Sequence, residues 1–254
     1  MIRIRGKGVT YGEVWFDEEP QAPLPDILIC RQRSQPWPSA QCEDFVTLLV
    51  DLTQDEEALF GTFGKDNRYK IRRAATKDNC TCIFYDEPAA ELDAFCRFYD
   101  LFASAKRLGP VYRNWLDQAI AARRVILTCA RQNEESRVWH AYIVSGDRVR
   151  LYYSASLFRA EDKDLQAVIG RLNRWLHWQD MLEFKRRGFR IYDLGGIFSD
   201  ESSSVAAGIN RFKKEFGGVK SAGFDCTVAL TWKGRMYLSL LDLRDRIPRA
   251  KATE

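Results

Sequence analysis

The chain has 254 residues, of which 46% are apolar and 29% are charged, enough for a packed core in one large domain or two small ones. Its net charge of only +4 excludes a polycationic chain, so any contact with nucleic acid must come from a local basic patch. The sequence contains no run of 18 apolar residues and no apolar signal-peptide core, which argues against a membrane span and against secretion.

The seven cysteines are scattered, odd in number and without a Cys-x-x-Cys pair. With only His140 and His177 as histidines, this pattern gives no basis for a zinc site. We interpret the cysteines as buried, reduced thiols and expect a cytoplasmic protein without a metal or other cofactor.

Residues 1–44 are the loosest part of the sequence. Five prolines fall between positions 20 and 38, which predicts an irregular lead-in around one short strand at 27–30. The remainder, 45–254, is assigned to the main domain. It opens with a compact apolar run at 45–52 that predicts a strand.

Helix signals follow this strand. Thr53 is the predicted N-cap, and Glu56 completes a capping box for a helix that runs to Phe63. The later elements predicted in chain order are a helix at 67–76, a strand at 81–85, helices at 88–106 and 113–123, strands at 125–130, 138–145 and 149–154, a helix at 164–187, a strand at 190–194, a helix at 204–216, a strand at 223–232, and a helix or strand at 235–246. This order predicts a mixed α/β fold with one central sheet.

The first basic cluster lies in the helix predicted at 67–76 and its flanks. It consists of Lys65, Arg68, Lys70, Arg72, Arg73 and Lys77, within thirteen residues. Such a cluster suits a phosphate-bearing partner, either RNA or a nucleotide-linked precursor. A solvated helix face is an equal alternative.

Two tyrosines end the third strand of the central group. Strand alternation sends Tyr152 and Tyr153 to opposite faces, so that one lies in the core and the other lines a cleft. A core position for both is the alternative.

A further strand ends in Tyr192-Asp-Leu-Gly-Gly. Asp193 is a candidate general base or substrate anchor, and the alternative is that it ties down its own loop by accepting hydrogen bonds from backbone amides. Gly195 and Gly196 permit a positive φ or a close backbone approach.

The helix predicted at 204–216 carries two adjacent lysines. A helical wheel places its apolar residues on one stripe, expected to be buried and formed by Val205, Ile209, Phe212 and Phe216. Lys214 points away from this stripe, whereas Lys213 lies about 70° from its centre, at the edge of the buried face. There its ammonium group can reach a cleft and meet an oxyanion, a phosphate or a carboxylate. The alternative is that both lysines are solvated charges near a helix C-terminus.

Together these stretches resemble the FemABX-type peptidyltransferases, a branch of the GNAT-like acyltransferase superfamily. The resemblance is carried by 68–74, by 152–156, and by 192–197 followed by 208–218. It implies a GNAT-like fold and transfer of an aminoacyl group from aminoacyl-tRNA to an amine, usually on a peptidoglycan precursor. The lysine of that family's Phe-Lys-x-x-Phe-Gly motif is thought to assist the reaction, and here it matches Lys213.

The resemblance and the residue patterns together give a set of candidate site residues. The candidate catalytic residues are Lys213, Asp193 and Tyr153. The candidate substrate-binding residues are Arg68, Arg72, Arg73, Tyr152, Ser154, Tyr192, Gly195, Gly196 and Asn210.

Two alternative functions stay open. One is an acyl-CoA-dependent N-acyltransferase of the same fold. Acetyl-CoA enzymes of this superfamily hold the pyrophosphate in a glycine-containing loop before the long helix, whereas residues 156–164 here contain no glycine. The other is a non-catalytic module that binds a partner or an RNA. The chain is long enough for one of the two halves common in the FemABX-type family. A homodimer is also expected, because a single half leaves one domain face unaccounted for.

Overall fold

The computed structural model describes residues 1–6, 8–157, 162–200 and 202–246. The chain divides into two compact units, one formed by 1–45 together with the residues from 222 onward and the other by 46–221. The boundary passes through two long strands, β4 (Gln41–Asp51) and β10 (Val219–Ala229). Residues from 222 onward thus group with the N-terminal segment, whereas the sequence patterns assigned them to the main domain.

The first unit contains more regular structure than its prolines predicted. Its strands follow the order β1-β2-β3-β10, with β1 at Ile2–Arg5, β2 at Thr10–Trp15 and β3 at Ile27–Arg33, and α7 spans Trp232–Arg246. The β2–β3 pair is parallel, and the β1–β2 and β3–β10 pairs are antiparallel. The prediction of an irregular lead-in with one short strand was wrong. The prolines fall in the connections between strands, where they remove no hydrogen bond from the sheet.

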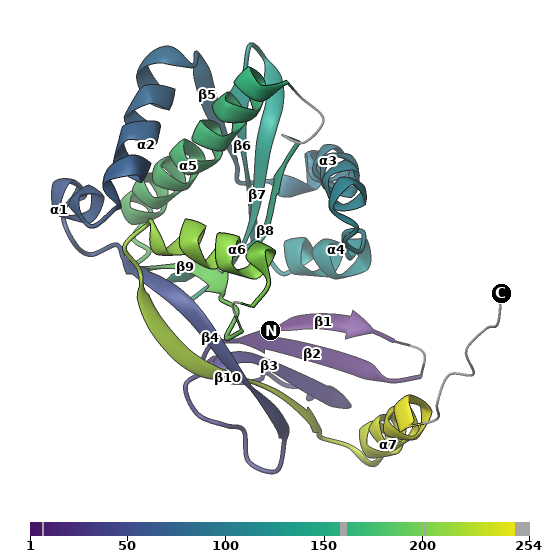
Figure 1. Cartoon of the computed structure of the whole chain (residues 1–254). Coiled ribbons are helices and arrows are strands. Elements are labelled where there is room, and N and C mark those ends of the chain that lie inside the picture. Colours follow the sequence, from purple (N-terminus) through teal and green to yellow (C-terminus); the bar gives the residue numbers. More distant parts are fainter. Residues whose placement is uncertain (7, 158–161, 201, 247–254) are drawn as a thin grey trace. The chain divides into compact units, whose positions relative to one another are not determined.

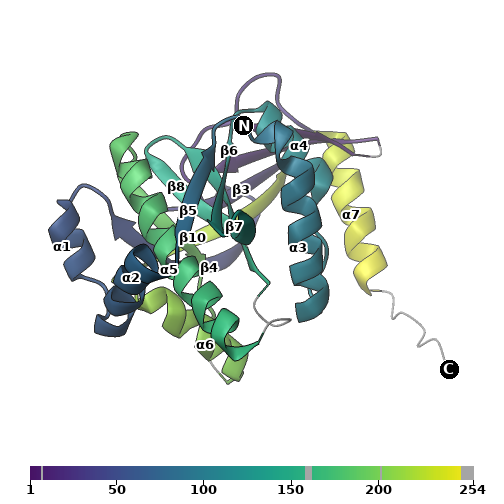
Figure 2. The ribbon, with the colours of Figure 1, turned by 90° about the horizontal axis from the view of Figure 1, so that it is seen from above.

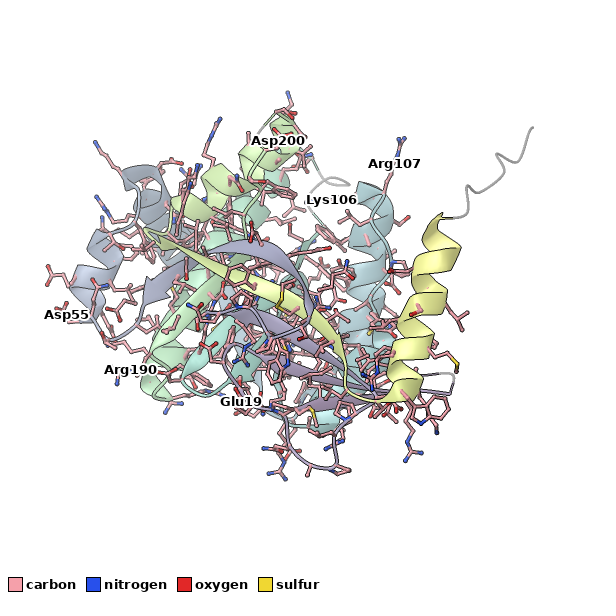
Figure 3. All side chains as sticks on the ribbon, turned by 90° about the horizontal axis from the view of Figure 1, so that it is seen from below. Glu19, Asp55, Lys106, Arg107, Arg190 and Asp200 are labelled. Atoms are coloured by element: carbon pink, nitrogen blue, oxygen red, sulfur yellow. A yellow bond between two sulfur atoms is a disulfide. The ribbon has the colours of Figure 1, made fainter. Side chains whose placement is uncertain are left out.

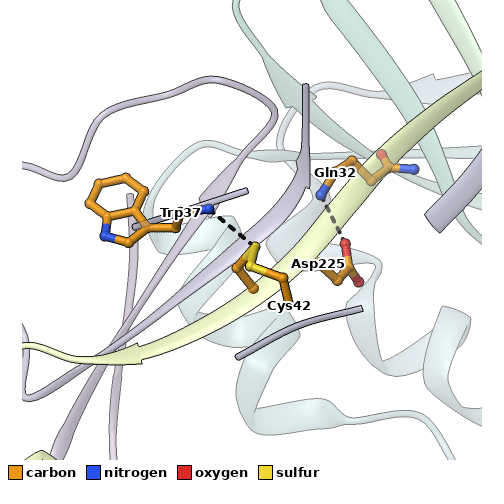
Figure 4. Close-up of a disulfide and its surroundings, with 5 residues drawn as sticks. Gln32, Trp37, Cys42 and Asp225 are labelled. Carbon is orange, nitrogen blue, oxygen red and sulfur yellow. Dashed lines mark hydrogen bonds between the residues drawn. A yellow bond between two sulfur atoms is a disulfide. The ribbon is translucent and has the colours of Figure 1, made fainter. Parts of the chain in front are cut away.

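A disulfide joins Cys42 of β4 to Cys226 of β10 (Figure 4). The backbone N–H of Trp37 donates to the Cys226 sulfur. The carboxylate of the preceding residue, Asp225, accepts from the backbone N–H of Gln32 at 2.8 Å (Figure 4). The interpretation of all seven cysteines as reduced thiols was therefore wrong. The two partners are 184 residues apart, so their spacing gave no signal, and only strand pairing brings them together.

The second unit is built on a mixed sheet with the strand order β4-β9-β8-β7-β6-β5. Its strands besides β4 are β5 (Cys80–Tyr85), β6 (Val125–Gln132), β7 (Glu135–Ser145), β8 (Arg148–Ser156) and β9 (Ile191–Gly196). Its helices are α1 (Glu56–Gly61), α2 (Lys65–Lys77), α3 (Leu92–Lys106), α4 (Arg113–Ala121), α5 (Lys163–Arg186) and α6 (Ser204–Lys214), with a short 3-10 turn at Pro88–Ala90. The predicted mixed α/β class is confirmed.

Helices cover both faces of this sheet. Figures 1 and 2 show α2 and α5 on one face and α3 and α4 on the other. Strand β6, which lies between β5 and β7, is consequently buried over six consecutive residues, from Val125 to Ala130, as expected for a strand with both faces covered. The long helix α5 packs Ile169, Leu172, Leu176 and Phe184 into the core. Within the described part of the chain, no helix has the length and apolar character needed to cross a membrane.

One helix start differs from the sequence prediction. The N-cap of α1 is Asp55, whose carboxylate accepts from the backbone N–H of Ala58 at 2.8 Å. Thr53 instead donates its hydroxyl and backbone N–H to Asp51, at the end of β4. Asp55 is the better acceptor for the exposed amides of the first turn, because its carboxylate is charged.

Candidate active site

The site begins where two parallel strands separate. Strands β8 and β9 pair only from Arg148 to Arg150 and from Ile191 to Asp193. Beyond this point β8 continues along β7, while β9 continues along β4. Two strands that diverge leave backbone groups between them without a ladder partner, so a ligand placed there can approach the main chain.

Gly195 occupies the start of this divergence with a φ of +78°. A Cβ at this position would lie 3.1 Å from the Leu151 carbonyl oxygen, 3.6 Å from Lys213 Nζ and 3.9 Å from an Arg150 guanidinium nitrogen. Two cationic groups therefore converge on a buried point of the main chain where only glycine fits without crowding or backbone strain. An anion or a developing oxyanion is the chemical group that this point suits best.

Lys213 reaches the site from α6. Its Nζ donates to the carbonyl oxygen of Gly196 at 2.6 Å, and the side chain is largely covered, whereas the neighbouring Lys214 is exposed. Burial, reinforced by the nearby charge of Arg150 and opposed by Asp193, lowers the pKa of Lys213 to about 8. The ammonium form thus predominates at neutral pH, with a neutral fraction of about one tenth at pH 7.

Asp193 is fully buried at the end of β9. Its carboxylate accepts from the Thr47 hydroxyl, from the backbone N–H of Gly195 at 2.7 Å, and from the guanidinium of Arg148. This geometry matches the alternative in which Asp193 ties down its own loop. The carboxylate holds Gly195 in place and contributes negative charge near Lys213.

The buried face of α6 differs from the predicted stripe. Phe216 is buried as expected, but Val205 is 62% exposed and Ile209 36% exposed, so the stripe was wrong for these two residues. Asn210 is buried instead, because its side-chain amide accepts from the backbone N–H of Phe198 and donates to the Phe198 carbonyl. Asn210 therefore anchors the loop before α6, and this polar anchor fixes how the helix is rotated.

The two tyrosines of β8 lie on the same side of the sheet. A bulge pairs Ala141 with Tyr153 and Tyr142 with Leu151, which leaves Tyr152 without an opposite residue. The rings of Tyr152 and Tyr153 are consequently 4.8 Å apart, and the prediction that they point to opposite faces was wrong.

These rings form an aromatic wall with the helices on that face. Tyr152 stacks on Trp115 of α4 at 4.3 Å, and Tyr153 meets Tyr99 of α3 edge to face at 4.7 Å. The Tyr153 hydroxyl accepts from the backbone N–H of Tyr112, and burial raises the pKa of Tyr153. Ser154 follows on β8, half-buried and opposite His140.

Tyr192 lies in the core and not on an accessible surface. Its hydroxyl contacts the Tyr142 hydroxyl and His177 Nδ1, both at 2.7 Å, within a buried polar network that continues to Asp180 and His140. Burial raises the pKa of Tyr192 and lowers that of His177, so both stay neutral near pH 7. The network also supports α6 from the core side, because the His177 ring packs on Phe212 and Phe216.

The three candidate arginines of α2 have separate environments. Arg68 donates to the carbonyl oxygens of Gly61 and Phe63 and so fixes the turn between α1 and α2. Arg72 lies over the ring of Phe60, with 5.2 Å to the ring centroid. Arg73 is exposed and donates to the Tyr69 hydroxyl at 3.1 Å.

Arg148 and Arg150 were not among the site residues predicted from the sequence. The structure groups Lys213, Arg150, Gly195 and Gly196, and Arg148 anchors Asp193 beside them. The signal was the alternation Arg148-Val-Arg150 at the start of a strand, which places two cations on one face.

The segment before the long helix offers no free anion site at its described end. Asp162 is the N-cap of α5, and its carboxylate accepts from the backbone N–H groups of Asp164 and Leu165 at 3.0 and 2.9 Å. Of the glycine-free stretch 156–164, residues 158–161 lie outside the described residues.

Comparison of the sequence with protein-family models and with curated proteins gives no match. Solved structures do share the fold. FemX superposes with a TM-score of 0.58 at 13% identity, covering 77% of this chain and 63% of FemX, so the chain spans less than two thirds of FemX. L-PGS from Bacillus licheniformis gives 0.52 at 12% identity, covering 88% and 74%. The C-terminal domain of a proposed lysylphosphatidylglycerol synthetase from Agrobacterium fabrum gives 0.51 at 14% identity, covering 86% and 72%. The fold expected from the resemblance, that of FemX, is confirmed.

Proposed function

We propose that the protein transfers an aminoacyl group from aminoacyl-tRNA to an amine acceptor. The observation that carries this proposal is the convergence of Lys213 and Arg150 on Gly195, at the point where β8 and β9 separate. Two partly buried cations beside the main chain of Gly195 suit a reaction in which negative charge develops on a carbonyl oxygen.

The reaction we propose is aminolysis of an ester. The acceptor nitrogen attacks the carbonyl carbon of the aminoacyl ester, and a C–N bond forms while the carbonyl oxygen becomes an oxyanion. The Lys213 ammonium stabilises this oxyanion, and Arg150 adds positive charge beside it. The C–O bond to the ribose then breaks, and the leaving ribose oxygen takes the proton that the nitrogen loses.

The N-terminus of α5 favours an RNA-linked ester over a CoA thioester. The Asp162 carboxylate occupies the first amides of α5, and Asp164 adds a second negative charge in the same turn. Both groups repel a pyrophosphate at the place where a helix N-terminus would otherwise bind it. One of the structures with this fold is named for lysylphosphatidylglycerol, a lipid that carries a lysyl group, which also supports an aminoacyl donor.

The acceptor we infer is an amine on a peptidoglycan precursor or on another peptide. This part of the proposal rests on the resemblance of 192–197 and 208–218 to the FemABX-type family. The half-buried aromatic wall of Tyr152 and Tyr153 gives such an acceptor an apolar surface close to the point where the strands diverge. Tyr153 is thus proposed as a residue that orients the acceptor.

The experiment is transfer of radiolabel from a mixed pool of charged tRNAs to cell extract. Lys213→Met keeps the length of the side chain but removes the ammonium group, and Lys214→Met is the matched control on the adjacent exposed lysine. We expect transfer by the wild type and by Lys214→Met, sharply reduced transfer by Lys213→Met, and complete loss after ribonuclease treatment. Equal transfer by the wild type and Lys213→Met, or transfer that survives ribonuclease, contradicts the proposal.

A further inference from the structure

Two cavities lie side by side on the helical face formed by α2, α5 and α6. The first, of about 280 Å³ and here named the α2–α5 groove, is lined by Tyr69, Lys70, Arg73, Ala167, Gly170, Arg171 and Arg174. The second, of about 420 Å³ and here named the α6 cavity, is lined by Gly64, Ala207, Arg211, Lys214 and Glu215. They adjoin at the ion pair between Arg174 and Glu215, whose N–O distance is 3.1 Å.

The charge of this face departs strongly from that of the chain. Helix α2 carries six basic residues and one acidic residue, Asp66, within its thirteen positions. The whole chain has a net charge of only +4, so positive charge is concentrated here and negative charge lies elsewhere. A local surplus of this kind attracts polyanions even when the average charge of a protein is small.

The cations of the groove fall into two classes. Arg171 makes two hydrogen bonds to the buried carboxylate of Asp78, at 2.6 and 2.8 Å, and Arg174 is held by Glu215, so these two arginines fasten α5 to its neighbours. Among the described residues, Lys70 pairs only with Asp66, whose side chain is 62% exposed, and Arg73 contacts only the uncharged Tyr69 hydroxyl. An exposed ion pair contributes little, so an incoming phosphate can replace Asp66 as the partner of Lys70.

The remaining lining fits a nucleotide chain. Tyr69 is 57% exposed beside Lys70 and Arg73, so its ring is available for stacking on a base or a ribose. Gly170 leaves the floor open, because a Cβ there would meet no atom within 4 Å. A concave groove with one aromatic ring and two accessible cations suits a strand of phosphates better than a flat bilayer, which would require several apolar anchors.

We propose that the α2–α5 groove binds the phosphodiester backbone of an RNA, with Lys70 and Arg73 contacting phosphates and Tyr69 stacking on a nucleotide. The identity of this RNA as the donor tRNA rests on the proposed function, whereas the binding itself does not. In that role the groove holds the body of the donor, and Lys213 acts on its aminoacyl end.

The test is fluorescence anisotropy of an uncharged RNA hairpin with a single-stranded 3′ end. The variants are the double charge reversal Lys70→Glu/Arg73→Glu and the control Lys106→Glu/Arg107→Glu at the end of α3, where Figure 3 shows Arg107 extending outward. Both doubles change the net charge equally. We expect the groove double to bind more than tenfold more weakly with a salt slope smaller by about 2, and the control to bind within about twofold of the wild type.

Two further arms separate the possible failures. Lys213→Met should bind the hairpin like the wild type. RNA binding by the wild type without any aminoacyl transfer supports the proposal that the groove binds RNA and contradicts the proposed function. Equal weakening of RNA binding in both double variants, or no weakening in the groove double, overturns the proposal that the groove binds RNA. Vesicles rich in phosphatidylglycerol form the last arm, and loss of vesicle binding in the groove double with unchanged RNA binding assigns the face to a lipid headgroup instead. Circular dichroism of every variant verifies folding.

Discussion

Two regions of the second unit concentrate positive charge, and they do so in opposite ways. At the active site Lys213 is drawn out of water beside Gly195 and the partly buried Arg150, and the pKa of Lys213 falls to about 8. In the α2–α5 groove, Lys70 and Arg73 stay at the surface, in reach of solvent and salt. Desolvated charges act strongly over a few ångströms, whereas exposed charges act weakly and are screened by salt. The first arrangement suits chemistry, and the second suits binding and orientation of a polyanion.

The largest expected effect separates chemistry from binding. Lys213→Met should lower the single-turnover rate at saturating tRNA by about 10²–10³-fold, as expected for removal of an oxyanion-stabilising group, while RNA affinity stays within about twofold. Raising the salt concentration should weaken RNA binding and leave the saturated rate of the wild type nearly unchanged. A saturated rate that falls equally in Lys213→Met and in Lys70→Glu/Arg73→Glu would erase the distinction between the two regions.

The next effect concerns the scaffold of the active site. Asp193→Asn places an amide donor against the Arg148 guanidinium and removes a buried charge, so we expect the free energy of unfolding to fall by about 2–4 kcal/mol. Urea unfolding measures this change. Asp200→Asn, on an exposed carboxylate that contacts only Ser202 among its resolved partners, is the control and should change stability by less than about 0.5 kcal/mol. An Asp193→Asn protein as stable as this control is incompatible with the anchoring role.

A smaller effect is visible in the pH dependence of stability. The pKa of Lys213 is about 8 in the folded chain and close to 10.5 in the unfolded chain, so between these values the unfolded state binds more protons. The free energy of unfolding of the wild type relative to Lys213→Met should therefore increase from pH 7 to pH 10, by about 1–3 kcal/mol. Other titrating groups cancel in this difference. A difference that is constant with pH would falsify the assigned burial of the ammonium group.

The smallest effect sharpens the description of the groove. Gly170→Ala should stabilise the fold by about 0.5–1 kcal/mol, because alanine favours a helix and its Cβ meets no neighbouring atom. The added methyl group narrows the groove floor, so RNA affinity should fall a few-fold. Gly208→Ala on α6 is the matched control, with equally open space and no place in either cavity lining, and it should give the same stabilisation with unchanged RNA binding.

Local patterns predicted much of the second unit. The three-strand group β6–β8 and the long helix α5 were found from apolar spacing and turn residues, because their pairing and packing follow nearest neighbours in the chain. The helical wheel also placed Lys213 at the edge of a covered face and Lys214 in solvent, as the structure has them.

Features set by distant partners were not predictable in this way. The bulge at Tyr152 depends on the register against β7, and the rotation of α6 depends on the hydrogen bonds of Asn210 to Phe198. The Cys42–Cys226 disulfide and strands β1 and β2 require pairing that single-chain periodicity does not encode. Polar side chains with specific partners thus account for the main errors at the site, since hydrophobic patterning treats them as solvent-exposed.

Glu215 connects the segment that carries Lys213 to the helices of the α2–α5 groove. Its backbone carbonyl accepts from Gly64 N–H and from the Asn67 side chain at the start of α2, and its carboxylate holds Arg174 of α5. Lys213 precedes it by two residues on the same segment. Under the two proposals above, the groove and Lys213 act on the same RNA donor, and the Glu215 segment connects them. Coupling between donor and acceptor binding is then reciprocal: the factor by which RNA changes acceptor affinity equals the factor by which acceptor changes RNA affinity.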